Sequence, residues 1–327
     1  MKKVVILHSD VPLDANEDEL DCLRQADTIS EALRKLGYDP VLMPFVLDLS
    51  RTSQALNDLR PEFVFNLVET INTKGSLIHL APALLDYLNI PYTGCGTDAM
   101  FLTSNKPLAK EMMQLAGIST PAWISSRGVY FGEAPSDTYL LKASWEDASV
   151  GLDENSIFAL SATKNVVALI AERKKKICGP CFAEAYIDGR EFNMALIAGK
   201  SGVQALPPAE MQFIDYAPGK LKLLDYRAKW VEGTFEYEHT ARTMDFSAED
   251  DELIADIQAI AQKCWNLFGL GGYARVDFRI DKNGKPWVLE INANPCLSLD
   301  AGFAFAVERA ALQYHEAIEL IVNDALK

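Results

Sequence analysis

The sequence predicts an α/β fold that becomes α+β in the C-terminal half of the chain. In residues 1–96, strand-like and helix-like segments alternate, which is typical of a parallel sheet covered by helices. Residues 272–296 instead have the pattern of an antiparallel hairpin. With 327 residues the chain is too long for one small core. We therefore expect two or three domains.

Composition indicates an ordinary soluble globular protein, with 49% hydrophobic and 24% charged residues. The net charge of -15 argues against a nucleic-acid partner or an anionic membrane, which bind basic surfaces. The N-terminus is apolar for only a few residues and reads as a buried strand, not a signal peptide, and no later run is long enough to span a bilayer. We expect a cytoplasmic protein whose six cysteines are reduced thiols.

A Cys-x-x-Cys motif at Cys178 and Cys181 has three interpretations. A redox pair needs its first cysteine after a strand and at the start of a helix, but here a helix precedes the motif and a strand follows it. No second motif of this kind or histidine cluster completes a zinc site. We favour a turn with incidental thiols.

The first part follows the order β-α-β-α-β. A strand over residues 4–8 leads to an amphipathic helix that ends at Gly37, and further strands are expected at 40–44 and 63–68. A helix is expected near 78–88. This order predicts right-handed crossovers and ligands at the carboxyl ends of the strands.

Acidic residues follow the first strand, in an expected loop that contains Asp10, Asp14, Glu17, Asp18, Glu19 and Asp21. Residues 66–69 follow a later strand, so both segments are expected at one ligand-binding edge. Near Glu19 and Asp21 the loop is suited to holding a substrate amine. A solvated acidic surface is an equal alternative.

Residues 94–105 mark a boundary, after which a helix is expected from Pro107 to Gly117 and a strand from Pro121. A further strand at 139–142 ends in Lys142. The polar segment that follows contains Ser144, Ser149 and Gly151. A lysine beside such a loop is suited to binding the phosphates of a nucleotide.

The next elements are a helix at 162–174, strands at 182–187 and 191–197 around an Asp-Gly turn, and a loop at 225–230. A long helix begins with a capping-box-like pair, Ser247 and Asp250, and ends at Gly269. One alanine-rich helix from Phe303 to about Leu326 closes the chain.

The hairpin carries the most informative pattern. Asn283-Gly284 predicts a two-residue type I′ turn, so that Lys282 pairs with Lys285. Counting outward places Asp277 opposite Glu290 and Arg275 opposite Asn292, all on one face. Opposed carboxylates repel, by a few tenths to about 1 kcal/mol, unless a cation lies between them. Carboxylate and amide oxygens suit Mg²⁺ that takes its other ligands from phosphates and water, and the arginine suits a phosphoryl or carboxylate group. The alternative is a solvated hairpin whose outer face happens to be charged.

In their order and spacing, motifs along nearly the whole chain resemble the ATP-grasp superfamily, in its D-alanine-D-alanine ligase-like branch. The motifs are Ile90-Pro91-Tyr92-Thr93-Gly94, Asn105-Lys106, Gly117-Ile118 with Thr120-Pro121, Lys142 with Ser149-Val150-Gly151, residues 184–191, Asp225-Tyr226 with Lys229, Ala274-Arg275-Val276-Asp277, Leu289-Glu290-Ile291-Asn292 and Asn294-Pro295.

The resemblance implies a Rossmann-like substrate domain (1–96) and two ATP-grasp subdomains (97–188 and 189–327) that hold ATP between two antiparallel sheets. It implies nucleotide contacts from Lys106, Lys142, Ser149, Glu184, the backbone of Ala185 and Ile187, and Glu191. Mg²⁺, or Mn²⁺, would be bound by Asp277, Glu290 and Asn292. Arg275 and Lys229 would be catalytic, stabilising the transferring phosphoryl group. The resemblance also implies amino-acid-like substrates and a homodimer.

Departures from the family pattern concern the substrate end. A Pro-Gly pair and a later serine are usual after Asn292, whereas this chain has Pro295-Cys296 and, later, Ala301-Gly302. Other departures are Trp230 in place of tyrosine, residues 145–148 in the phosphate loop, and Glu69 in place of histidine.

Three functions are consistent with these patterns. The first is an ATP-dependent carboxylate-amine ligase that acts through an acyl phosphate and makes a dipeptide or related amide. The second is an ATP-binding module without ligase activity, with a regulatory or partner-binding role. The third is a redox protein that uses Cys178 and Cys181, which requires a thiol of depressed pKa.

Overall fold

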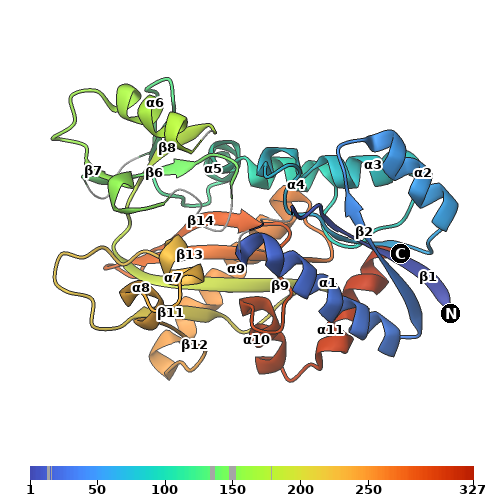
Figure 1. Cartoon of the computed structure of the whole chain (residues 1–327). Coiled ribbons are helices and arrows are strands. Elements are labelled where there is room, and N and C mark those ends of the chain that lie inside the picture. The colour runs from blue at the N-terminus through green and yellow to red at the C-terminus, as the bar shows by residue number, and fades with distance from the viewer. Residues whose placement is uncertain (13–14, 16, 133–136, 147–151, 178) are drawn as a thin grey trace.

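The computed structural model describes residues 1–327 except 13–14, 16, 133–136, 147–151 and 178. Its strands form three sheets. Figure 1 shows the N-terminal sheet (blue) beside the C-terminal helix α11, and the two other sheets (green, and yellow to orange) stacked at the opposite end of the molecule. The three sheets fall within the three expected ranges, whose boundaries stay predictions.

The N-terminal sheet is parallel and has the strand order β2-β1-β3. Its elements are β1 (Lys2–Ser9), α1 (Glu17–Lys35), β2 (Tyr38–Phe45), α2 (Leu49–Leu59), β3 (Val64–Leu67) and α3 (Leu80–Leu88). Val4 and Ile6 of β1 pack into one core with α1 and α11, while Val5 and Leu7 pack into a second core with α2 and α3. The central strand is therefore buried on both faces, which confirms the predicted β-α-β-α-β arrangement.

The second sheet is antiparallel, with the order β5-β4-β8-β6-β7. It follows α4 (Thr97–Ser104) and α5 (Lys106–Leu115) and contains β4 (Trp123–Ile124), β5 (Tyr130–Phe131), β6 (Thr138–Ala143), β7 (Ile157–Ala159) and β8 (Cys181–Ala185). Helix α6 (Val166–Lys176) covers one face, where Val166 and Ile170 pack against Leu141 and Ala183. The opposite face is left for a ligand.

The third sheet is also antiparallel and has the order β12-β11-β9-β13-β14, with β10 added to β9. Its elements are β9 (Gly189–Gly199), β10 (Gly202–Ala205), β11 (Ala209–Phe213), α7 (Tyr226–Trp230), α8 (Phe235–Glu238), β12 (Thr240–Thr243), α9 (Asp251–Phe268), β13 (Tyr273–Asp281), β14 (Pro286–Asn292), α10 (Gly302–Arg309) and α11 (Tyr314–Ala325). Phe192, Val276 and Phe278 pack with α4, α5 and α9 in one core. The remaining face of β13 carries its polar residues.

The predicted hairpin turn is wrong, yet the predicted pairing of the functional residues is right. Gly284 alone has a positive φ (79°) in the turn, and the N–H of Asp281 donates to the carbonyl of Lys285 at 3.0 Å, so the loop has three residues and not two. Asp281 and Lys285 therefore pair, instead of Lys282 and Lys285. A β-bulge at Leu289 adds one residue to β14 and restores the expected register of Asp277 with Glu290.

Three helix predictions also need correction. The acidic residues from Glu17 to Asp21 begin helix α1 and are not in a loop, and Asp14 lies outside the described residues. Residues 97–104, within the expected boundary segment, form α4, and the expected loop at 225–230 contains α7. The sequence predicts a helix where apolar residues recur over a long segment. Helices α4 and α7 are too short to show such a pattern, and α1 begins with polar residues.

The starts and breaks of the C-terminal helices differ as well. The pair Ser247 and Asp250 makes no side-chain cap, because a short 3₁₀ turn comes first and Asp250 instead pairs with Arg190 at 2.5 Å. The final alanine-rich segment is two helices, because Ala311 adopts φ 58° and Gln313 begins a new capping box. Helix propensity alone predicts one continuous helix, but propensity is a weak guide that tertiary packing can override.

Gly272 comes directly before strand β13 of the third sheet and lies against Gly94, in the segment that follows the N-terminal sheet. It has φ +63°, and a Cβ placed there would lie 2.8 Å from both N and Cα of Gly94. Its N–H donates to Asp324 of α11 at 2.9 Å. No residue with a side chain fits this close approach without moving the backbone.

We predict that Gly272→Ala destabilises the protein more than Gly37→Ala, measured as the free energy of unfolding in denaturant. Gly37 also has a positive φ (+88°) but nothing within 4 Å of a Cβ, so its substitution costs only the left-handed penalty of about 1–2 kcal/mol. Gly272→Ala adds a clash worth about 1–3 kcal/mol more. Equal losses in the two variants would contradict the close approach.

Candidate active site

A cavity of about 740 Å³ lies between the two antiparallel sheets and reaches the carboxyl ends of the N-terminal strands. Its wall contains every predicted site residue that the structure describes. These are Lys106, Lys142, Glu184, Ala185, Ile187, Glu191, Lys229, Arg275, Asp277, Glu290 and Asn292. The remaining one, Ser149, lies outside the described residues.

The centre of the cavity is formed by the paired strands β13 and β14. Asp277 lies opposite Glu290 and Arg275 lies opposite Asn292. The guanidinium of Arg275 donates from Nε and Nη2 to the two oxygens of Asp277, at 2.7 and 2.8 Å. Asn193 of the neighbouring strand β9 donates to the same carboxylate at 2.8 Å. Asp277 is thus fixed in orientation by donors from two strands.

Glu290 is surrounded by cations. Its carboxylate lies 3.5 Å from the ammonium of Lys106, which also donates to the carbonyl of Glu146 at 2.9 Å. Burial raises the pKa of Glu290, but the charges of Lys106, Lys142, Lys229 and Arg275 outweigh burial and lower it to about 2. The carboxylate is therefore ionised at neutral pH, in a setting with more cations than anions.

Lys229 reaches this centre from the short helix α7. Asp225 caps that helix by accepting from the N–H of Ala228 at 2.9 Å, which fixes where the lysine emerges. Burial lowers the pKa of Lys229, while the charge of Glu290 opposes that shift. Within the described residues the ammonium has no hydrogen bond or ion pair. It is available to an anionic ligand.

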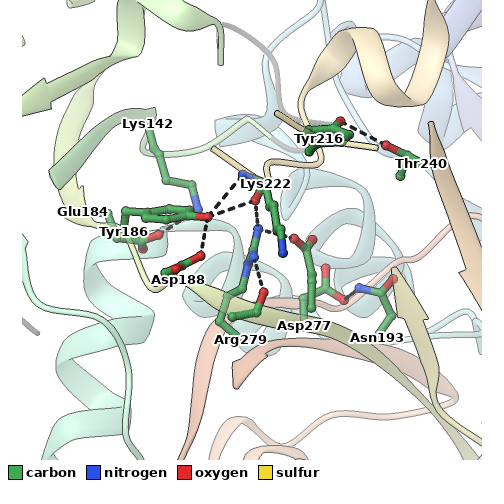
Figure 2. Close-up of polar contacts among 12 residues, drawn as sticks. Lys142, Glu184, Tyr186, Asp188, Asn193, Tyr216, Lys222, Thr240, Asp277 and Arg279 are labelled. Atoms are coloured by element: carbon green, nitrogen blue, oxygen red, sulfur yellow. Dashed lines mark hydrogen bonds and ion pairs between the residues drawn. The ribbon is translucent and has the colours of Figure 1, made fainter. Parts of the chain in front are cut away.

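Glu184 is held by two lysines, one of which the sequence did not indicate. Its oxygens lie 2.9 Å from Lys142 and 2.6 Å from Lys110, and Figure 2 shows Lys142 and Glu184 side by side. Lys110 is 1% exposed and also donates to Thr120 at 2.7 Å. Burial lowers the pKa of Lys110, and the charge of Glu184 opposes this. The only sequence signal for Lys110 was a lysine on the apolar side of helix α5.

Glu191 is paired with Arg279, the second residue that sequence reasoning left without a role. The two side chains are 2.7 Å apart, and Arg279 also donates to the carbonyls of Gly189 and Lys222. Figure 2 shows Arg279 beneath Lys222, with the hydroxyl of Tyr186 directed at the same segment. The signal was present in the alternation of β13, which puts Arg275, Asp277 and Arg279 on one face.

One predicted nucleotide contact is narrowed to a single backbone group. The backbone N–H of Ala185 donates to the carbonyl of Ala122 at 2.8 Å, because strands β8 and β4 pair there. A contact of the Ala185 backbone with a nucleotide would therefore involve its carbonyl, and this contact stays a prediction. Ile187 follows the end of β8 and lines the cavity.

The far end of the cavity is acidic. Asp10, Asp21 and Glu69 line it, so the two segments expected at the ligand-binding edge do meet there. Asp21 accepts from the thiol of Cys296 at 2.9 Å and from Ser298 at 3.2 Å, while Glu69 accepts from Gln25 at 3.0 Å. The solvated alternative for this segment is therefore not what the structure shows at Asp21, which is 8% exposed.

Cys181 does not have the features of a redox thiol. It is buried at the start of β8, and burial raises its pKa to about 11. Its partner in the motif, Cys178, lies outside the described residues. A reactive thiol needs a lowered pKa, so the structure gives no support to redox chemistry at Cys181.

The donor set on β13 and β14 fits Mg²⁺. Asp277 and Glu290 carry carboxylates on adjacent strands. Asn292 carries an amide on the same face, and its oxygen, which accepts from the N–H of Asn294 at 2.9 Å, could also bind a cation. Among the described residues no three His, Cys, Asp or Glu side chains cluster as a metal site, so this set depends on the amide and on further oxygens from a ligand. Such a set is typical of Mg²⁺ bound together with phosphates.

Comparison with known proteins identifies this arrangement. The family model described as D-ala D-ala ligase C-terminus matches residues 138–323, which include both antiparallel sheets beyond β5 and the whole hairpin. The chain belongs to this family. Its members' ATP-grasp fold is the fold seen here, and an ATP-dependent ligase is the activity that the family match and the relatives support.

Relatives cover almost the full chain. A D-alanine--D-alanine ligase of Aquifex aeolicus is 26% identical over 305 residues, covering 92% of this chain and 94% of the relative. An uncharacterised protein of Sinorhizobium fredii, y4sG, is 29% identical over 308 residues and covers 92% and 87%. The D-alanine--D-alanine ligase of Bacillus anthracis has the same fold, with a TM-score of 0.73, 17% identity and coverage of 100% and 97%. A second structure of that ligase is a complex with ATP.

Helices long and apolar enough to cross a membrane are absent from the described part of the chain.

We predict that Lys110→Met is destabilising because the lysine and its partner Glu184 are both buried. The substitution leaves the carboxylate of Glu184 with one cation, Lys142, and should cost about 1–3 kcal/mol in the free energy of unfolding. Lys176→Met removes a surface lysine 3.9 Å from Glu172 and should cost at most about 0.5 kcal/mol. If Lys110→Met unfolds at the same denaturant concentration as Lys176→Met, the buried pair is not as the structure describes it.

Proposed function

We propose that the protein is a carboxylate-amine ligase that joins amino-acid-like substrates into a dipeptide or related amide. The carrying observation is the set of cations that converges on the cavity centre: Lys106, Lys142, Lys229 and Arg275 face Asp277 and Glu290. Relatives named D-alanine--D-alanine ligase over nine-tenths of the chain support the choice of reaction.

The chemistry follows from where charge develops. The carboxylate of one substrate attacks the γ-phosphate of ATP, which gives an acyl phosphate and ADP, and the amine of a second substrate then displaces phosphate. Lys106 and Lys142 would hold the phosphates, and Lys229 and Arg275 would stabilise charge on the transferring group. An acyl phosphate held between the two facing sheets would be shielded from water, which would otherwise hydrolyse it.

We assign Asp277, Glu290 and Asn292 to the binding of Mg²⁺. When bound, the ion would neutralise charge on the phosphate oxygens and orient them. Arg275 and Asn193 keep the carboxylate of Asp277 in place, and the cations around Glu290 keep it ionised. The set therefore combines an oriented carboxylate at Asp277 with an ionised carboxylate at Glu290.

Residues on β8 and β9 would contact the nucleoside part of ATP. Glu184 and Glu191 would face the adenine and the ribose, and each is oriented by a cation behind it, Lys110 and Arg279 respectively. Ser149, which lies outside the described residues, is also assigned to nucleotide binding. We propose a cytoplasmic location and a homodimer as family properties of this chain.

An ATP-binding module without ligase activity is the less favoured function. A protein that only binds ATP does not need Lys229 and Arg275 in addition to the lysines that hold the phosphates. It also does not need a cavity that continues past the nucleotide to a wall of acidic residues and arginines. This chain has both features.

Asp277→Asn should lower ligase turnover by about 100-fold or more, because the oriented carboxylate is lost from the metal set. The assay is ADP release and product formation with ATP, Mg²⁺ and a panel of D- and L-amino acids. Asp256→Asn, an exposed change on helix α9, is the matched control and should leave turnover unchanged.

Absence of amino-acid-stimulated ADP release from the wild-type protein across the whole panel would contradict the ligase assignment. Full turnover in Asp277→Asn would contradict the metal assignment alone.

A further inference from the structure

Arg242 lines the cavity, as Arg24, Arg275 and Arg279 do, and it is outside the residues assigned above. It lies on β12, the outer strand of the third sheet, where it pairs with Met211 of β11, which in turn pairs with Glu191 of β9. All three residues line the cavity. The side chain of Arg242 therefore extends from the cavity face of the sheet, and it does so toward the start of helix α10.

The guanidinium is positioned by two features of α10. It stacks on the ring of Phe305, with Cζ 4.8 Å from the ring centroid. Its Nη2 lies 3.7 Å from where a Cβ would be at Gly302, so the lack of a side chain there leaves the guanidinium open. Ala301, the preceding residue, contributes only a methyl group and also lines the cavity.

Arg242 and Arg275 differ in whether their guanidinium groups have an ionic partner. Arg275 is already bound at two points by Asp277, at 2.7 and 2.8 Å. The guanidinium of Arg242 has no hydrogen bond or ion pair within the part of the chain that the structure describes. Partial burial and the nearby charge of Arg275 lower the pKa of Arg242, and the charge of Asp300 opposes this. The guanidinium is thus a cation whose hydrogen-bond donors face the cavity.

We propose that Arg242 is a specificity-determining residue, which binds a carboxylate carried by the substrate that supplies the amine. This inference rests on the proposed function. In that reaction the carboxylate of the first substrate is consumed at the phosphate centre, beside Lys229 and Glu290, so it is not the group that reaches Arg242. The carboxylate that remains belongs to the second substrate. A guanidinium binds it through two parallel hydrogen bonds.

The test compares an amino acid with its carboxamide as the acceptor, at saturating ATP and first substrate. Wild-type protein should strongly prefer the acid. Arg242→Met should raise KM for the acid by about 10- to 100-fold, the usual effect of losing a hydrogen-bonded charge partner, and should remove the preference over the amide. KM for ATP should not change. Arg242→Lys keeps the charge without the paired geometry and should fall between the two.

Arg309→Met is the matched control, because Arg309 is on the same helix as Phe305 but pairs with Asp245 at 2.6 Å away from the cavity wall. It should keep the preference for the acid. If Arg242→Met also keeps that preference while turnover is normal, the inference is overturned and the ligase assignment stands. If Arg242→Met raises KM for ATP instead, the residue belongs to the nucleotide and the inference is again overturned. A wild-type protein with no turnover would overturn the ligase assignment itself.

Discussion

Two carboxylates face each other across one β-ladder, and most of the cavity is arranged around that opposition. Asp277 and Glu290 would destabilise the hairpin if nothing neutralised them. Arg275 binds one of them, and three lysines from three other elements, α5, β6 and α7, surround the other. The carboxylates in turn offset the repulsion among these cations. The hairpin, helix α7, strand β6 and the start of helix α5 are thus coupled through charge, and the excess of cations is suited to binding phosphates.

Strand β13 sets the order of functions along the cavity. Its alternate residues Arg279, Asp277 and Arg275 are spaced at two-residue steps, about 7 Å apart. Arg279 pairs with Glu191. In the proposed function this pair would lie at the nucleotide end, Asp277 would bind the metal ion, and Arg275 would face the reacting groups. Beyond it the wall changes from basic to mixed, with Asp21 and Glu69 on one side and Arg242 on another. The geometry for ATP and the geometry for the substrates are therefore separate parts of one wall.

Local patterns in the sequence were enough to predict the strands of the N-terminal sheet, the long helix ended by Gly269, and the pairing of Asp277 with Glu290. That pairing came out right because two one-residue errors cancel: the turn at Gly284 has three residues, and the bulge at Leu289 restores the register. The resemblance to a family supplied most of the remaining site residues. Neither the resemblance nor the local patterns predicted the cations that pair with the buried glutamates. Lys110 lies 74 positions from Glu184 and Arg279 lies 88 from Glu191 (184 − 110 and 279 − 191), and only the tertiary fold brings such pairs together. Short helices such as α4 and α7 were missed because packing, not periodicity, determines them.

The central claim is that Asp277 and Glu290 form one metal site for a nucleotide held between the sheets. Electron paramagnetic resonance of Mn²⁺ tests it most directly, because the free ion and the protein-bound ion have different spectra. With ATP present, the wild-type protein should bind Mn²⁺ and the doubly substituted Asp277→Asn, Glu290→Gln protein should lose most of that binding while staying folded by circular dichroism. Equal Mn²⁺ binding by the two folded proteins would contradict the claim.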